Sequence, residues 1–280
     1  MTSNTRTSLR AAGSLLVACI AMGASDALAT ADSVVIAQAA HRVNDLIVTH
    51  RYRDAERELL ALERSYPNTP AVHAQKTVLY YTWIDDYGIA DSLADVFMNS
   101  MSRTIELADS ILSEDSRDAQ TRFCKGSVLA YRSLFRSYTE GIRVSNIPSL
   151  IGDATGGINE LERAFELDPN LADALIGVGK YQHWKSQKFP WPFATKNDAR
   201  KGVRTLERAI EIGVDWEAGA LQTLGWVYIA EKRYDDALAL ALPMIERYPT
   251  TRFFKEIAGR AYLAQQQYDL SERYHQDILD

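Results

Sequence analysis

The sequence predicts an all-α protein, and three observations lead to that prediction. The chain of 280 residues holds only 15 glycines and 8 prolines, the residues that turn-rich β folds need for their backbone angles. Proline steps that end helices, such as Tyr66-Pro67, Asp168-Pro169 and Tyr248-Pro249, recur along the chain. No segment after residue 30 shows the apolar alternation and flanking turn residues of a half-buried strand.

The N-terminal segment, residues 1–29, predicts a secretory signal peptide. Arg6 and Arg10 give a basic start, residues 11–22 form an apolar run, and residues 27–29 have the small-x-small pattern of a cleavage site. The run is too short for a transmembrane helix, which needs about 20 continuous apolar residues. We therefore expect residues 30–280 to form a single domain that is periplasmic or secreted.

The two cysteines bear on whether the protein is anchored to a membrane and whether it can form a disulfide. Residues 16–19, Leu-Val-Ala-Cys, resemble a bacterial lipobox, in which Cys19 would be lipidated and would anchor the protein at a membrane. Cleavage after Ala29 would instead remove Cys19 and leave Cys124 alone, so that no intramolecular disulfide is expected. Cys124 lies in an apolar pattern with Phe123 and Val128, and we expect it to be a buried side chain.

Composition and charge narrow the class of protein. Hydrophobic residues make up 46% of the chain and charged residues 24%, values typical of a soluble globular protein. The 31 basic and 37 acidic residues give a net charge of −6, which argues against nucleic acid as a partner.

A sequence repeat marks the C-terminal third of the chain. Three residues return at one fixed spacing: Gly225, Tyr228 and Tyr234 recur as Gly259, Tyr262 and Tyr268. Ala237 and Pro249 complete the pattern of the first unit. The pattern resembles the tetratricopeptide repeat, and the chain resembles an exported bacterial protein of that family. The resemblance implies a right-handed superhelical solenoid of antiparallel helix pairs, with small residues where the paired helices touch.

The same frame extends upstream with less regular spacing. A first unit falls near residues 36–69, and the whole chain is expected to hold about five to six helical hairpins of this type. Three of them are enlarged between their two helices, around residues 84–100, 138–153 and 185–198. Pro243 lies inside the helix expected over residues 235–248 and should kink that helix or shift its start.

Motifs for catalysis or metal binding are weak. The five histidines have no metal-binding spacing and no cysteine joins them, so that neither a metal nor a cofactor is expected. The glycine-rich residues 152–157 could cradle phosphate, but we expect a helix start there, with Asp153 or Thr155 as its N-cap and Gly157 at a helix contact. No nucleophile motif is present, and we expect no enzymatic activity.

Candidate binding residues follow from the resemblance. In tetratricopeptide proteins the first helix of each hairpin lines a concave groove, and its groove-facing positions map onto Tyr81, Phe123, Tyr131, Lys180, His183, Trp184, Gln222, Trp226, Phe253, Glu256 and Arg260. This set is rich in the aromatic residues that are enriched at binding hot spots. Trp191 joins the site from residues 181–193, an aromatic and proline-rich segment that either plugs the groove or forms one wall of a ligand pocket.

These observations predict a protein that acts by non-covalent recognition. The resemblance implies a scaffold of the bacterial cell envelope that binds a protein or peptide partner along the groove. A small-molecule-binding envelope protein associated with a transporter is the alternative. An open trough would suit a peptide, whereas an enclosed cavity of about 300 to 1,000 Å³ would suit a small ligand.

Overall fold

The computed structural model describes residues 31–279 except residues 142, 144 and 189–195, and this part of the chain is helical without any strand. The all-α prediction is therefore confirmed. The expected signal peptide, Cys19 and Trp191 lie outside the described residues. The helices are α2 (Ala31–Val48), α3 (Tyr52–Ser65), α4 (Pro70–Tyr87), α5 (Ala90–Glu114), α6 (Ala119–Thr139), α7 (Ile147–Leu167), α8 (Ala174–Lys188), α9 (Lys196–Ile212), α10 (Glu217–Ala230), α11 (Tyr234–Arg247), α12 (Arg252–Ala264) and α13 (Tyr268–Leu279).

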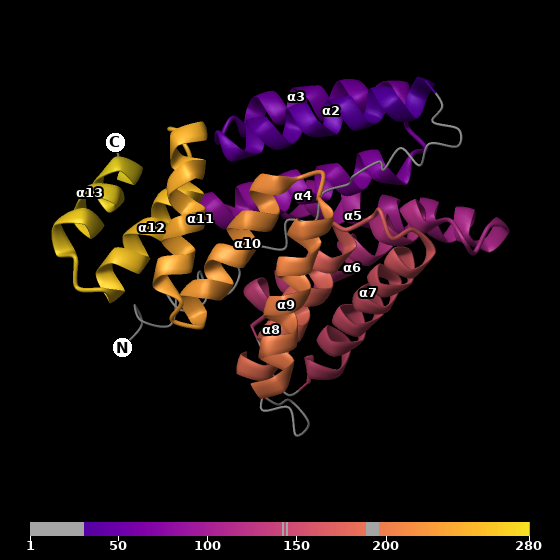
Figure 1. Ribbon diagram of the computed structural model, residues 1–280. Helices are drawn as coiled ribbons and strands as arrows, with labels where there is room; N and C mark the ends of the chain where they lie inside the picture. The colour runs from indigo at the N-terminus through magenta and orange to yellow at the C-terminus, as the bar shows by residue number, and fades with distance from the viewer. Residues whose placement is uncertain (1–30, 142, 144, 189–195, 280) are drawn as a thin grey trace.

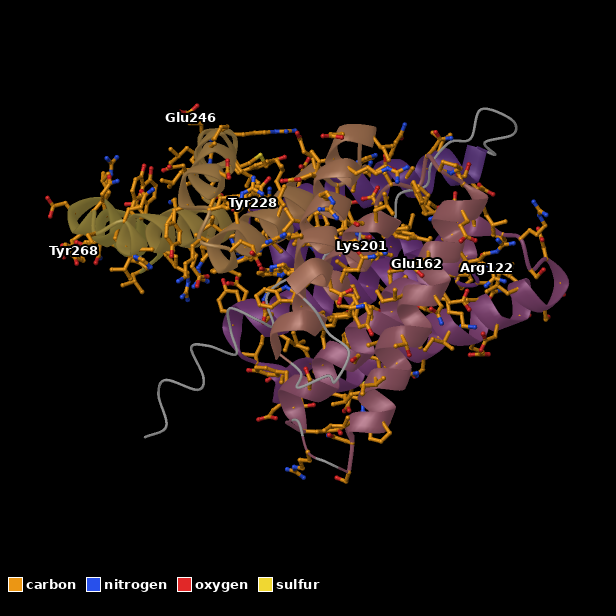
Figure 2. All side chains as sticks on the ribbon, turned by 60° about the horizontal axis from the view of Figure 1, so that its bottom comes forward. Arg122, Glu162, Lys201, Tyr228, Glu246 and Tyr268 are labelled. Atoms are coloured by element: carbon orange, nitrogen blue, oxygen red, sulfur yellow. The ribbon has the colours of Figure 1, made fainter. Side chains whose placement is uncertain are left out.

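Consecutive helices pack in pairs, from α2 with α3 to α12 with α13, and each pair also packs on the next one along the chain. The pair α2 and α3 covers the first expected unit near residues 36–69. Figure 1 shows α12 and α13 at one end of the molecule, whereas α2 and α3 lie along α4 and extend toward α11. Tyr268, at the outer end of the last pair, is 62% exposed (Figure 2).

Three of the pairs share one turn conformation. His50, Lys232 and Gln266 have left-handed backbones, with φ of 59°, 60° and 61°. The N–H of the following residue donates in each case to a carbonyl five positions earlier, at 2.8 to 2.9 Å. This hydrogen-bond pattern is common at the C-terminal ends of helices. A residue with a left-handed backbone turns the chain there, so that a following N–H can donate to a free carbonyl of the last turn. Lys232 and Gln266 are separated by the same interval as Gly225 and Gly259, so the sequence period has a structural counterpart.

Glycines allow the paired helices to approach closely. A Cβ on Gly157 would lie 2.8 Å from the carbonyl oxygen of Gly126, and a Cβ on Gly202 would lie 2.5 Å from that of Gly179. Neither position has room for a side chain, because the neighbouring atoms belong to the backbone of the partner helix. The expected role of Gly157 at a helix contact is confirmed.

The expected enlargements are mostly additional helical turns. Helix α5 begins at Ala90 and has 25 residues, so that residues 90–100 extend it toward its N-terminus. Residues 147–153 likewise form the start of α7, which continues to Leu167. The third enlargement includes residues outside the described part of the chain. Phe97 of α5 and Leu150 of α7 are buried and attach these two extensions to the core, whereas most of residues 90–96 remain exposed.

Two local expectations need correction or refinement. The N-cap prediction was wrong, because α7 begins at Ile147 and Asp153 lies inside it, where its carboxylate accepts from Arg132 at 2.6 Å. Helix α11 runs through Pro243 and begins at Tyr234, one position before the expected start. Proline removes one backbone donor from a helix, but both Pro243 and Ala239 are exposed, so that water can satisfy the carbonyl that loses its partner.

Two helices lie mostly inside the core. Most residues of α4 and α10 are buried, so that neighbouring helices cover the larger part of each one. Cys124 is buried and forms no disulfide within the described residues. Burial also raises the pKa of the Cys124 thiol, as expected for an unreactive core side chain.

Asp173 is a buried carboxylate that joins two parts of the fold. It lies in the turn before α8 and accepts hydrogen bonds from the backbone N–H groups of Asp215, at 3.0 Å, and Trp216, at 3.4 Å. These residues lead into α10, so that Asp173 fixes the start of that helix. Burial raises the pKa of Asp173 from 3.8 to about 7, although the two N–H donors oppose this shift.

We expect Asp173 to make stability depend on pH. The pKa of Asp173 is higher in the folded state than in the unfolded state, which means that the folded state binds the proton more tightly. The contribution of Asp173 to the free energy of unfolding is therefore complete below pH 4 and is lost as the pH rises to 7. The free energy of unfolding should fall by about 2 to 3 kcal/mol from this group between pH 5 and pH 8. Urea unfolding should show a smaller change in Asp173→Asn, and an unchanged pH dependence in that variant would contradict this assignment.

Candidate functional site

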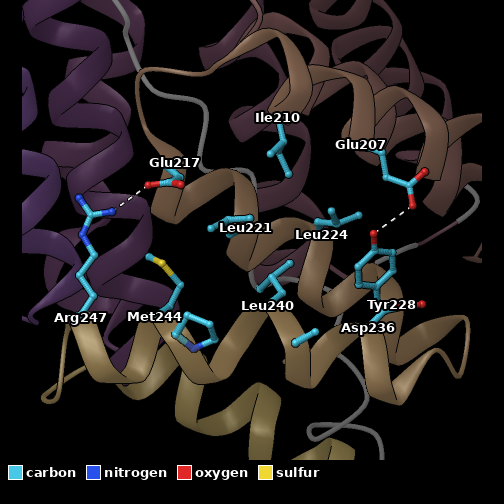
Figure 3. Close-up of a pocket in the computed structure, with 12 residues that line it drawn as sticks. Glu207, Ile210, Glu217, Leu221, Leu224, Tyr228, Asp236, Leu240, Met244 and Arg247 are labelled. Atoms are coloured by element: carbon cyan, nitrogen blue, oxygen red, sulfur yellow. Dashed lines mark hydrogen bonds and ion pairs between the residues drawn. The ribbon is translucent and has the colours of Figure 1, made fainter.

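A groove lies on the outside of the molecule between α9, α10 and α11. It has a volume of 610 Å³. Its lining residues are Glu207 and Ile210 of α9, Glu217, Leu221, Leu224 and Tyr228 of α10, and Asp236, Ala239, Leu240, Pro243, Met244 and Arg247 of α11. Figure 3 shows these side chains pointing into the space between the three helices.

Helix packing produces the groove. Both α9 and α11 pack against α10, but they make almost no contact with each other, so that α10 forms the floor between two walls. Leu221 and Leu224 of the floor face Ile210 on one wall and Leu240 on the other (Figure 3). Leu221, Ile210 and Leu240 are only half-buried, which leaves an accessible apolar strip along the groove. Binding of an apolar partner to this strip would be favourable, because it would remove apolar surface from water.

Charged side chains lie at both ends of the groove and form ion pairs there. At one end the Tyr228 hydroxyl donates to Glu207 at 2.9 Å, and Arg233 binds Glu207 at 3.1 Å and Asp236 at 2.6 Å. Burial raises the pKa of Tyr228 to about 12, so the hydroxyl keeps its proton and remains a donor. At the other end Arg247 binds Glu217 at 2.8 Å, as the dashed line in Figure 3 marks. Each rim carboxylate therefore has a cationic partner.

The lining offers binding rather than acid–base or nucleophilic chemistry. It contains no histidine, cysteine, serine or lysine, and its carboxylates are engaged by arginines. Across the part of the chain that the structure describes, no group of three histidine, cysteine or acidic residues could hold a metal ion. An apolar strip bounded by charged ends is suited to an elongated ligand that is apolar along its length.

Most of the predicted groove residues lie inside the protein. The structure buries Tyr81, Phe123, Tyr131, Lys180, His183, Gln222 and Trp226, whereas Trp184, Phe253, Glu256 and Arg260 are partly exposed. Neighbouring helices cover the side chains of the first group, so that these residues belong to the interior of the array. Buried residues contribute to binding only after the packing around them opens. Their role in recognition, and that of Trp191, stays a prediction.

The structure brings several of the predicted residues together in small clusters. The rings of Tyr81 and Tyr131 are 4.9 Å apart, and Phe97 packs against Tyr81 at 6.2 Å. Arg260 lies over the ring of Trp226 at 5.2 Å and also binds Glu256 at 2.9 Å. These contacts are typical of a packed interior and its edge, so the clusters hold helices together.

His183 is part of a buried polar contact. Its Nε2 atom lies 2.8 Å from a carboxylate oxygen of Glu231, which follows α10, and its ring packs edge-on against Trp184 at 4.9 Å. Burial lowers the pKa of His183, and the hydrogen bond to Glu231 partly offsets that effect. The contact connects α8 with the end of α10.

Sequence reasoning missed the residues that line the outer groove. Gln222 and Trp226 were predicted from one face of α10, whereas Leu221, Leu224 and Tyr228 of the same helix line the groove from another. Pro243 gave a signal of its own, since a proline inside an expected helix is unusual, but it suggested a kink or a shifted helix start and not a groove. The spacing between α9 and α11 has no signature in the sequence, because it depends on how three helices pack.

Fold and site together define a helical protein built from packed pairs, with an apolar groove on its surface. No protein-family model matches the chain, and no curated protein shows significant similarity to it. None of the described helices combines the length and the apolar character that crossing a bilayer requires.

Proposed function

We propose that this chain is a non-enzymatic scaffold of the tetratricopeptide type, a right-handed superhelical solenoid that binds a protein partner. The sequence period, the shared turns at His50, Lys232 and Gln266, and the close helix contacts at Gly126 and Gly157 support the repeat assignment. The signal-like residues 1–29 support a place in the periplasm or outside the cell, with anchoring at Cys19 as the alternative.

The partner contributes an amphipathic helix that docks in the groove between α9 and α11. The observation that carries this proposal is the exposed apolar strip of Ile210, Leu221 and Leu240, which runs between two helices that hardly touch. A helix laid there would pack on α10 and fill the space between the walls, as in other helix-in-groove complexes. Its polar face would meet the charged rim and the surrounding water.

A small apolar molecule is the second candidate ligand, as for an envelope protein associated with a transporter. The groove volume of 610 Å³ falls in the range of small-molecule sites, which favours this reading. The exposure of Ala239, Pro243, Glu217 and Arg247 favours the peptide, because the groove is open along its length. A small ligand would remain largely in water there.

Ala239→Trp should abolish binding in the groove. Ala239 is exposed on the groove wall, so that an indole added there occupies the space without removing a core contact. Peptides selected from a display library of amphipathic helices on the wild-type protein should bind Ala239→Trp at least about 30-fold more weakly, equivalent to the loss of about 2 kcal/mol that is typical of a hot spot.

Ala61→Trp is the matched control, because Ala61 is also an exposed alanine within a helix, on α3. It should bind the selected peptides as the wild type does, and both variants should melt near the wild-type temperature. Equal binding by Ala239→Trp and wild type would contradict the groove as the site. Selection of no helical peptide, together with binding of a small apolar dye that Ala239→Trp blocks, would favour the second candidate.

A further inference from the structure

Exposed cations without a partner gather beyond one end of the outer groove. This is the end where the Tyr228 hydroxyl donates to Glu207 (Figure 3). Four exposed side chains there form neither an ion pair nor a hydrogen bond with any described residue. We call them the cationic end: Arg200, Lys201 and Arg204 of α9, and Lys232 of the turn between α10 and α11.

The course of the chain places these cations at that end. Arg204 precedes the groove-lining Glu207 by nearly one turn of α9, and Arg200 precedes it by about two turns. Lys232 is followed by Arg233, which binds Glu207 at 3.1 Å. The wall that α9 forms therefore continues past the groove as a positively charged ridge.

Unpartnered carboxylates gather beyond the opposite end, where Arg247 binds Glu217 at 2.8 Å. Their side chains are exposed and form no ion pair or hydrogen bond within the described part of the chain. We call them the acidic end: Glu211 in the last turn of α9, Asp215 in the turn before α10, and Glu246 in the last turn of α11. Figure 2 shows Lys201 and Glu246 well apart, with Tyr228 between them in that view.

The carboxylates near the cationic end do not cancel its charge, because each one already has a donor. Their partners are Arg233 for Glu207 and Asp236, Gln265 for Asp235, and His183 for Glu231. Arg208 of α9 has a different neighbour, since it lies over the Phe165 ring of α7 at 5.7 Å. The unpartnered charges thus differ in sign between the two ends of the groove.

Helix stability does not explain these charges. Arg200 and Arg204 are four positions apart on α9, a spacing at which like charges repel each other. Glu211 and Glu246 lie in the last turns of their helices, where the helix dipole disfavours a negative charge. A partner that carries the opposite charges at its two ends would remove both kinds of unfavourable interaction.

We propose that the groove binds a helix with one acidic end and one basic end, and binds it in a single direction. This inference rests on the proposed function, because it concerns the helix docked between α9 and α11. The acidic end of the partner lies on the cationic end of the groove, and its basic end lies at the acidic end. The opposite direction would bring like charges together at both ends.

The length of the groove fits such a partner. From Glu217 to Tyr228 the floor of the groove spans about 16 Å of α10, at 1.5 Å per residue. A helix of about 18 residues, roughly 27 Å long, covers the apolar strip and extends past both ends. Its terminal turns then reach the unpartnered charges, while its middle turns contact Leu221 and Leu240.

Two synthetic helical peptides of identical composition test this polarity. Both have one face of leucine and isoleucine; in the first, glutamates occupy one end and lysines the other, and in the second the same charges alternate along the polar face. The first peptide should bind about tenfold more tightly at low salt, because several exposed ion pairs act together. This advantage should disappear at about 0.5 M salt.

Reversing the charge of the cationic end should remove the advantage of the first peptide. The double variant Arg200→Glu/Arg204→Glu should bind both peptides with similar affinity. Arg64→Glu/Arg273→Glu is the matched control, because these exposed arginines lie on α3 and α13 and give the same change in net charge. The control should retain the tenfold difference.

Paramagnetic broadening of the Met244 methyl signal reports the direction of binding. Met244 lines the groove nearly one turn before Arg247, and so lies toward the acidic end. A nitroxide on the lysine end of the first peptide should broaden this signal strongly. A nitroxide on the glutamate end should broaden it much less.

The outcomes separate this inference from the groove itself. Equal affinity of the two peptides, or equal broadening by the two labels, would overturn the polarity while leaving the groove as the site. If neither peptide affects the Met244 signal, the proposed groove fails and the polarity fails with it. If Arg200→Glu/Arg204→Glu loses binding to phosphatidylglycerol vesicles but keeps the tenfold peptide difference, the cations serve a membrane surface and the proposal is overturned.

Discussion

Replacing Tyr131 with alanine should lower the free energy of unfolding by about 3 to 5 kcal/mol, the range for large aromatic side chains removed from a core. Tyr131 is fully buried on α6 and packs against Tyr81 at 4.9 Å. Truncation leaves a cavity, because the buried side chains around Tyr131, such as Tyr81, can fill it only in part. Denaturant unfolding measures the loss directly.

Tyr138→Ala is the control for this prediction, because Tyr138 lies on the same helix but is 42% exposed. Its removal should change the free energy of unfolding by no more than about 0.5 kcal/mol. Similar small losses in the two variants would mean that Tyr131 is accessible, as expected for a residue of a concave binding groove rather than of the core.

Gly157→Ala should be strongly destabilising even though alanine is the better helix former. The added Cβ would lie 2.8 Å from the Gly126 carbonyl oxygen and 2.9 Å from the Ala130 backbone nitrogen, so α6 and α7 must move apart. Overpacking of this kind costs about 1 to 3 kcal/mol and here involves backbone atoms that cannot change rotamer. Thermal and urea unfolding should both show the loss.

The neighbouring glycine provides a control of opposite sign. Gly156 lies on the same helix, and a Cβ there would meet nothing within 4 Å. Gly156→Ala should therefore raise the free energy of unfolding by about 0.5 to 1 kcal/mol, because alanine loses less backbone freedom on folding. A gain in stability for Gly157→Ala as well would contradict the close packing of α6 against α7.

The sequence was informative wherever a local rule decides the structure. Recurrence of Gly225 and Tyr228 as Gly259 and Tyr262 predicted helix pairs, and the structure has the matching turns at Lys232 and Gln266. The expected role of Gly157 held because a helix contact that tight accepts only glycine. The N-cap at Asp153 failed because α7 begins two turns earlier, where Pro148 in its first turn marks the start of the helix.

The candidate site depends on packing, which the sequence does not reveal. Gln222 and Trp226 occupy positions that line a groove in the resembling family, but here α10 is covered by its neighbours on that face. The outer groove exists because α9 and α11 stand apart on α10, a distance that depends on many side chains together. The contact of His50 with Arg252 joins residues 202 positions apart, beyond the reach of any local pattern.

Methionine methyl NMR tests most directly whether recognition occurs in the outer groove. Met244 lines the groove on α11, whereas Met101 is buried on α5, one turn after the Phe97 that packs against Tyr81. During titration with a selected helical peptide, the Met244 methyl signal should shift and that of Met101 should stay in place. A shift of Met101 with Met244 unchanged would place recognition near the buried aromatic cluster and would contradict the proposed groove.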